Sequence, residues 1–421
     1  MHWKIKIAKK LGAGLLALAC LGGVRAAVAD EVAGEQRFAF GGFGTLGLAR
    51  SDSNAARFVR DQTQPDGIGK HFSGKLDSLV GVQGAFRAAH DVEFVVQAIS
   101  RYGSHGDYRP EISWAFAKYN FTPNLTGRVG RMGTEFYLLA DSRHVGYSYL
   151  TVRPSVDFYG GLAFHHVDGA DLTGTIALGD GLLKGKVFAG QANELAPIGE
   201  QFLSMRGNPL SGGYIDYQEG NWQWRATMAR MTFKHDLPSP VSDLRNGLYQ
   251  MGAVFPGATA AADALGLKDK TSGFYSLGAV YDRGPLQVQM MLSRMRHETF
   301  SYQNSQAGYL LAGYRLGSVT PFAGYAWIKS KARQLQSGFP DFDADSAQLN
   351  LGLAGSLARV HMDQNTWTLG ARWDFRQDMA LKAQLDMIRG TPESIFLYPS
   401  STPGAFDGKL NVFSLSLDFV F

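Results

Sequence analysis

The residues whose spacing most suggests chemistry lie in the segment Met132–Gly169, which is rich in tyrosine and phenylalanine. Acids and bases occur together along it: Glu135, Asp141, Arg143, Arg153 and Asp157. Fixed charges that face one another across a narrow aqueous passage discriminate between ions. The role of these charges therefore depends on the elements that hold the segment and on whether water surrounds it.

Two other motifs contain the residue types of metal or nucleotide sites. His165 and His166 lie close to Asp168 and Asp171, but adjacent residues of a strand point to opposite faces, so we expect no metal site. Gly42–Gly47 matches G-x-G-x-x-G, a dinucleotide motif only where it joins a strand to a helix, and here it lies inside an alternating run. The sequence contains no G-x-S-x-G motif, which would indicate the nucleophile of a hydrolase. The sequence thus indicates no cofactor, no metal and no catalytic residue.

Composition excludes several classes of protein. Among 421 residues, 19% are charged, 12% are aromatic and 51 are glycine. A disordered chain would be polar and poor in aromatics, and a collagen needs glycine at every third position. Residues 1–29 contain five cations and no acid, and without them 36 cations remain against 37 anions. The net charge of +4 therefore does not indicate nucleic-acid binding, which needs a basic patch on the folded domain.

Residues 1–29 have the pattern of a cleaved secretory signal. Cations within Lys4–Lys10 precede the apolar run Leu11–Val24, and the small residues Ala27–Ala29 precede an acidic pair. The apolar run of about 14 residues is too short to cross a hydrocarbon core of ~30 Å as a helix. We expect export, cleavage after Ala29 and a mature domain of residues 30–421. The single cysteine lies inside the leader, so the mature chain offers no disulfide.

Apolar and polar residues alternate along most of the mature chain. In Leu410–Phe421, every second residue from Phe413 onward is phenylalanine or leucine. Because successive side chains of a strand point to opposite faces, this pattern indicates a strand with one apolar face. Trp367–Phe375 and Leu381–Met387 repeat it.

Turn residues join these runs into seven tight hairpins. The turns fall at 88–91, 122–124, 179–181, 218–221, 282–285, 317–320 and 376–378. Seven hairpins, with Phe38–Ala49 at the front and Leu410–Phe421 at the end, give sixteen strands. The other connections are mostly long: 51–74, 132–170, 191–211, 233–271, 331–365 and 391–408. Alternation at Leu349–Leu353 leaves eighteen strands as an alternative.

Short connections at one end, long ones at the other and an even strand number are the organisation of an outer-membrane barrel. A soluble β-sandwich also alternates, but sixteen strands are too many for one, and bulky aromatics such as Trp222 and Trp367 suit an interfacial girdle. We therefore predict an all-β fold, a transmembrane antiparallel β-barrel of about sixteen strands with both termini at the short-turn end. On its wall, Leu385 should face lipid and Gln384 water.

The mature chain resembles the Gram-negative general porins, the porin-like barrel proteins of gamma- and betaproteobacteria. The resemblance lies in the leader, in the opening strand F-A-F-G-G-F-G-T-L-G from Phe38, and in the aromatic strand that ends at Phe421. Gly130–Tyr159 is similar to the third loop of that family, which folds into the barrel. The resemblance implies a homotrimer in the outer membrane, in contact with lipid and lipopolysaccharide. It also implies that Phe419 and Phe421 form the signal read by the barrel-assembly machinery.

If Met132–Gly169 is that inward-folded constriction loop, its charges lie inside the lumen. Inward positions of the wall then supply cations opposite the loop: Arg128, Arg225, Arg372 and Lys382. We expect the acids of the loop to meet these cations across a narrow aqueous gap. The alternative is that several of the charges lie at the rim and pair locally.

The leading hypothesis is a porin that lets small hydrophilic solutes and ions diffuse passively through a water-filled channel. A substrate-selective channel with a basic track is the second reading. A barrel enzyme of lipase or protease type is the alternative from a different class, and no motif supports it. The loop lacks the long run of acids that many porins carry there, so the sequence favours neither anions nor cations.

Overall fold

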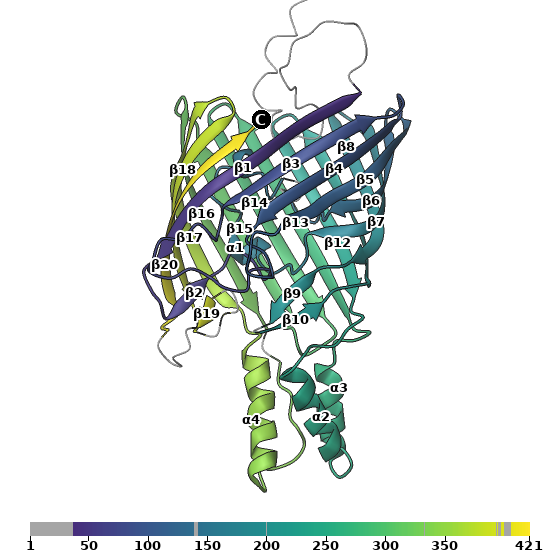
Figure 1. Ribbon diagram of the computed structural model, residues 1–421, viewed down its shortest axis with the longest axis vertical. Coiled ribbons are helices and arrows are strands. Elements are labelled where there is room, and N and C mark those ends of the chain that lie inside the picture. The colour runs from purple at the N-terminus through teal and green to yellow at the C-terminus, as the bar shows by residue number, and fades with distance from the viewer. Residues whose placement is uncertain are drawn as a thin grey trace, which may run out of the picture.

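Sixteen strands form a closed antiparallel barrel (Figure 1). The structure, a computed structural model, describes residues 37–138, 142–198, 200–331, 333–392, 394, 397–399 and 406–421. The predicted leader, residues 1–29, lies outside them. The barrel strands are β1 (Phe38–Ser51), β3 (Leu79–Arg87), β4 (Val92–Arg101), β5 (Glu111–Thr122), β6 (Leu125–Gly133), β7 (His166–Leu178), β8 (Gly181–Ala192), β11 (Asn208–Glu219), β12 (Trp222–Thr232), β13 (Thr271–Arg283), β14 (Leu286–His297), β15 (Ser305–Tyr314), β16 (Val319–Ser330), β17 (Asp363–Arg376), β18 (Met379–Gly390) and β20 (Lys409–Val420).

Each barrel strand pairs with the next one along the chain, and β20 returns to pair with β1. All seven tight turns lie where the sequence predicts them, and the long connections alternate with them. The C-terminus lies at the short-turn end, opposite the protruding helices (Figure 1). The predicted fold class and the count of sixteen are therefore confirmed.

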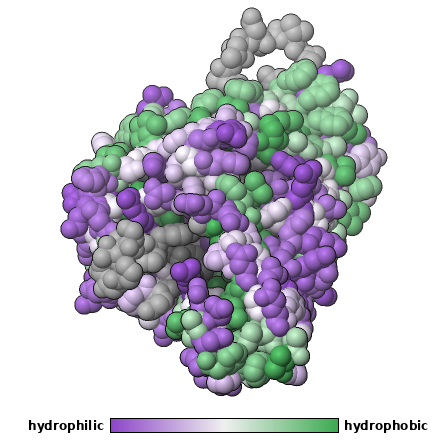
Figure 2. Space-filling model, turned by 60° about the horizontal axis from the view of Figure 1, so that its bottom comes forward, coloured by the Kyte–Doolittle hydropathy of each residue, from purple (hydrophilic) through white to green (hydrophobic). Residues whose placement is uncertain are grey.

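The long connections contain small elements of their own. Two-stranded sheets are formed by β9 (Leu195–Ile198) with β10 (Gln201–Ser204), and by β2 (Ala56–Phe58) with β19 (Leu397–Pro399). The helices α2 (Val241–Met251), α3 (Pro256–Leu265) and α4 (Ala344–Ala358) project beyond the barrel (Figure 1). These helices enclose a separate apolar cluster: Leu248, Ala258, Ala261, Ala262, Leu265, Phe339 and Leu353. The end that carries them is largely hydrophilic, whereas much of the barrel side visible above it is hydrophobic (Figure 2).

The alternative of eighteen strands is wrong, because the alternating residues Leu349–Leu353 belong to helix α4. The side chain of Asp343 accepts a hydrogen bond from the backbone N–H of Ser346 at 2.8 Å, and the Ser346 hydroxyl accepts one from the Asp343 backbone N–H. This reciprocal pair is a capping box, which starts a helix. The segment Ala344–Ala358 also contains no β-branched residue, so the propensity for a strand is low.

Barrel closure depends on glycine in β1 and phenylalanine at the end of the chain. Gly42 and Phe421 exchange two backbone hydrogen bonds, of 2.8 and 2.9 Å. A Cβ atom on Gly42 would overlap the ring of Phe421, and one on Gly44 would overlap the ring of Phe419. Each ring therefore lies over a position of β1 that only glycine leaves free.

The two faces of the wall differ as the alternation predicts. On β17, Trp367 is 53% exposed and Leu369 is 47% exposed, whereas inward residues of β20 such as Ser416 and Asp418 are buried. Leu385 faces outward, as expected. Gln384 faces inward but not water: its side chain accepts from the backbone N–H of Val152 at 2.7 Å. No helix in the described part of the chain is long and apolar enough to cross a membrane.

Deleting Phe421 should lower the yield of folded barrel. The deletion removes two backbone hydrogen bonds to Gly42 and the ring that covers it. The measurement is the heat-modifiable fraction of the protein in outer membranes. Phe375→Ala is the matched control, since it removes an exposed aromatic ring of β17 without touching the seam. Equal yields for the deletion and the control would contradict this account of closure.

Leu385→Arg and Gln384→Arg should fail in different ways. Leu385→Arg puts a charge into hydrocarbon, at a cost of about 2–4 kcal/mol near the midplane, and should reduce the amount of assembled barrel. Gln384→Arg should leave the barrel assembled and displace the loop at Val152, whose N–H loses its acceptor. Barrel assembly is read from heat-modifiable migration, and loop displacement from amide exchange at residues 147–159. Equal loss of assembled barrel would mean that the faces of β18 are misassigned.

Candidate functional site: the loop inside the barrel

The connection between β6 and β7 lies inside the barrel, as the sequence predicts. Its short helices are η2 (Gly146–Ser148) and α1 (Val156–Tyr159), and α1 is seen within the ring of strands in Figure 1. The hydroxyl groups of Tyr159 and of Tyr309 on β15 lie 3.1 Å apart. On another part of the wall, the Lys382 ammonium of β18 donates to the carbonyl of Gly146 at 2.7 Å. The loop therefore contacts well-separated strands of the barrel.

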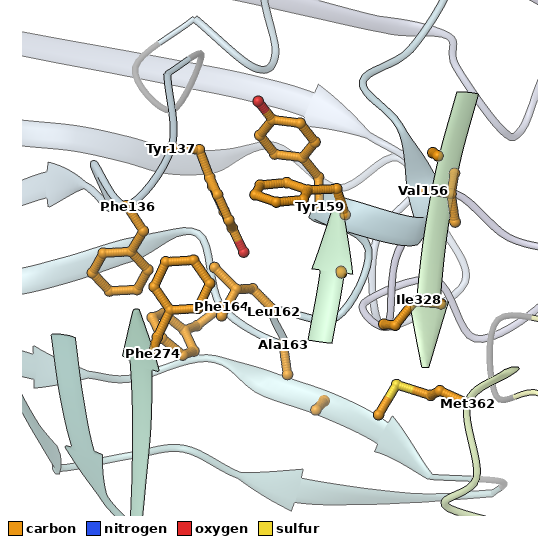
Figure 3. Packing of buried hydrophobic residues seen from close by; sticks show 14 of the residues in the cluster. Phe136, Tyr137, Val156, Tyr159, Leu162, Ala163, Phe164, Phe274, Ile328 and Met362 are labelled. Carbon is orange, nitrogen blue, oxygen red and sulfur yellow. The ribbon is translucent and has the colours of Figure 1, made fainter. Parts of the chain in front are cut away.

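One side of the loop packs through aromatic rings onto an aromatic part of the wall (Figure 3). The ring of Phe136 lies 5.9 Å from that of Phe274 on β13 and 5.6 Å from that of Phe188 on β8. Tyr137 and Tyr159 meet at 4.6 Å between ring centroids. The inner wall of a porin-like barrel is expected to be polar, and these inward phenylalanines depart from that rule. Sequence reasoning missed them, although apolar residues on both faces of β8 and β13 were a visible signal.

Arg153 is the most extensively bonded charge of the loop. Its guanidinium donates to both carboxylate oxygens of Asp77, at 2.9 and 2.7 Å, and to Asp386 at 2.8 Å. It also donates to the Ser414 hydroxyl at 2.6 Å. Burial lowers the pKa of Arg153, but Asp77 and Asp386 outweigh it and leave the pKa raised. Arg153 thus stays cationic and joins the loop to β18, to β20 and to the connection between β1 and β3.

Glu135 forms the second charged attachment. Its carboxylate accepts hydrogen bonds from Arg128 at 2.6 Å, from Lys186 at 2.5 Å and from the Tyr214 hydroxyl at 2.9 Å. Burial raises the pKa of Glu135, but Lys186 and Arg128 outweigh it, so the pKa is held well below its usual range. The expected aqueous gap between Glu135 and the wall is therefore wrong, because the charges are in direct contact. Asp171, which pairs with both cations, completes a group with two positive and two negative charges.

The other predicted wall cations hold the loop by its backbone. Arg225 pairs with Asp216 at 2.6 Å and donates to the carbonyl of Tyr137. Arg372 pairs with Asp374 at 2.7 Å and donates to two loop carbonyls, those of Tyr147 at 2.6 Å and Tyr149 at 3.0 Å. Lys382 pairs with Asp418 at 3.1 Å and donates to the carbonyls of Gly146 and Thr151. All three cations contact the loop, and each is paired with a carboxylate.

The remaining loop charges have different surroundings. Asp157 is 1% exposed and accepts from the Gln364 amide; burial raises its pKa to about 6. It is therefore covered by protein instead of facing water. Burial lowers the pKa of Arg143 to about 10, against the attraction of Asp61. Asp141 lies outside the described residues.

His165 and His166 bind the same carboxylate, contrary to the expectation that they point apart. Their Nδ1 atoms lie 3.0 and 2.8 Å from the oxygens of Glu194. The alternation of a strand does not apply to the pair, since β7 begins only at His166. Among the described residues, no group of three or more His, Cys, Asp or Glu side chains could hold a metal ion.

Comparison with known proteins finds similarity in fold. No family model matches the chain, and no curated protein matches it. An anion-selective porin from Comamonas acidovorans is 12% identical with a TM-score of 0.53, over 91% of this chain and 99% of that one. OmpF of Salmonella typhi, in complex with daunomycin, is 12% identical with a TM-score of 0.53, over 91% and 97%. OmpT of Vibrio cholerae, expressed in the outer membrane, is 12% identical with a TM-score of 0.50, over 93% and 100%.

Arg153→Met should release the loop without opening the barrel. The substitution leaves Asp77 and Asp386 buried without their cation, and breaking a buried ion pair in this way costs roughly 3–5 kcal/mol. The amides of residues 147–159 should then exchange with solvent much faster, while those of the barrel strands keep their protection. Arg376→Met is the control, because its ion pair with Asp378 is largely exposed. Unchanged exchange in the Arg153 variant would refute this role.

Proposed function

We propose that this chain is an outer-membrane pore through which small hydrophilic solutes and ions diffuse passively. The observation that supports it best is the loop between β6 and β7, whose described residues, 134–138 and 142–165, enter the lumen of a closed barrel and are attached to several strands at once. The barrel has an apolar outer face and charged groups inside. Such a loop restricts the passage by its position alone, without a moving part.

The charges inside the lumen support a pore more than the alternative of an open basic track. Arg128, Arg225, Arg372 and Lys382 each bind a carboxylate, and the last three also bind loop carbonyls. These contacts leave little net positive charge for an anion to follow. The same contacts support a pore over an enzyme, since the ionisable groups that the loop brings together hold the loop in place.

The proposal extends to the location and the partners of the protein. Residues 1–29 direct export and are removed after Ala29. The mature barrel is inserted by the barrel-assembly machinery, which reads Phe419 and Phe421. It lies in the outer membrane as a homotrimer, in contact with lipid and lipopolysaccharide.

Purified protein in planar bilayers tests the pore directly. We expect discrete conductance steps in KCl, and proteoliposomes that swell in isosmotic solutions of small sugars. Protein-free bilayers and heat-denatured protein are the controls. Folded barrels that give neither current nor swelling would exclude the proposed function.

Glu135→Gln should shift ion preference towards anions. The substitution removes one of the carboxylates that pair with Arg128 and Lys186, so the net charge at this place in the loop becomes more positive by one. The reversal potential in a KCl gradient should move in the anion-selective direction, and more so in dilute salt, because the Debye length is about 10 Å at 0.1 M and about 3 Å at 1 M. Glu200→Gln, on an exposed turn of another long connection, should leave the reversal potential unchanged. A shift of the same size in both variants would count against this placement of Glu135.

A further inference from the structure

A cavity of about 50 Å³ separates part of the loop from the wall. The loop contributes Tyr149, Thr151, residues 153–156 and Tyr159, and the wall contributes residues of β14 to β18. Space of this size holds a few water molecules or one solute of about four to six non-hydrogen atoms. We call it the loop–wall cavity.

The charged residues that line the loop–wall cavity neutralise each other. Arg153 and Asp386 both line it, and they pair at 2.8 Å. The second guanidinium nitrogen of Arg153 binds Asp77, while Asp386 also accepts from Thr368 at 2.7 Å and from Gln384 at 2.9 Å. An ion in the cavity would have to lose water without gaining an opposite charge, which is unfavourable. The lining therefore suits a neutral molecule.

Gln289 gives the loop–wall cavity a hydrogen-bond acceptor that is not in use. The residue lies on β14, lines the cavity and is 6% exposed. Its side-chain oxygen has no hydrogen-bond partner among the described residues. A buried acceptor without a partner is costly, so a molecule that donates a hydrogen bond is stabilised next to it.

The rest of the lining is mainly aromatic and aliphatic. Tyr159 and Tyr309 present ring surfaces, and Val156 and Ile388 present alkyl groups. Such surfaces pack against the C–H groups of a small polyol, while polar groups at a few points fix its hydroxyls. Apolar walls, one free acceptor and no net charge define the class of molecule that fits.

We infer that the loop–wall cavity is a solute subsite of the pore, and that it takes small neutral molecules with hydroxyl or amide donors, of the size of glycerol. The inference rests on the proposed function, because it assigns a preferred solute class to the same passage. A subsite speeds permeation when it binds solute well enough to draw it in and weakly enough to let it leave. Gln289 is then a specificity-determining residue that contacts the solute.

The test compares glycerol with alanine, a zwitterion with the same number of non-hydrogen atoms. Stopped-flow light scattering measures the permeability of proteoliposomes to each solute, and protein-free liposomes supply the background. Gln289→Met removes the acceptor. Gln289→Asn shortens the side chain by one methylene group, which moves the acceptor, and keeps a polar side chain in case the first variant folds poorly. Each should lower the glycerol-to-alanine permeability ratio about three- to tenfold, the effect of losing one hydrogen bond. Gln287→Met is the matched control, since Gln287 lies two residues away on the same face of β14 and does not line the cavity.

The outcomes separate the subsite from the pore. A ratio that falls in a folded Gln289 variant and stays constant in Gln287→Met supports the subsite. A ratio within 1.5-fold of the wild type in both Gln289 variants, or an equal fall in Gln287→Met, overturns the subsite and leaves the pore intact. Wild-type proteoliposomes that are no more permeable than protein-free liposomes to either solute overturn the proposed function itself.

Discussion

Every backbone N–H and C=O group in hydrocarbon must find its partner within the protein, and the rest of this structure follows from that constraint. The chain meets it by pairing β20 with β1, a seam in which Gly42 and Gly44 leave room for two phenylalanine rings. Once the sheet is closed, the alternation of each strand directs its apolar side chains to lipid and the other set inward. The wall therefore has a full set of inward side chains before the loop is placed.

Those inward side chains decide where the loop lies. Removing charges from water costs more than a single ion pair returns, unless further hydrogen bonds satisfy the remaining donors. Arg153 meets this condition with two carboxylates and a hydroxyl, and Lys382 meets it with one carboxylate and two carbonyls. Groups that would face water in an empty lumen thus bind the loop instead. Its position is fixed by contacts at several places around the wall, and the most extensive of them are those of Arg153.

The sequence predicts the structural features that depend on residues near one another in the chain. It does not predict the contacts between residues that are far apart in the chain. Strands and tight turns follow from period-two alternation, which is local. The five alternating residues Leu349–Leu353 suit a strand as well as a helix, so alternation alone does not predict helix α4. The cap at Asp343 decides for the helix. The partners of Arg153 could not be predicted, since Asp77 and Asp386 lie 76 and 233 residues away along the chain. Only the closed barrel brings them together.

The inner wall is chemically divided, and this division has a consequence for selectivity. Phe188, Phe274 and Tyr309 pack against the rings of the loop, whereas Arg372 and Lys382 bind its carbonyls. Because the wall cations are engaged in holding the loop, they contribute little net field to the passage. A solute beside the loop meets ring surfaces and hydrogen-bonding groups more than it meets uncompensated charge. In the proposed pore, discrimination between neutral solutes therefore depends on shape and hydrogen bonding, and discrimination between ions depends on the balance of paired charges such as those around Glu135.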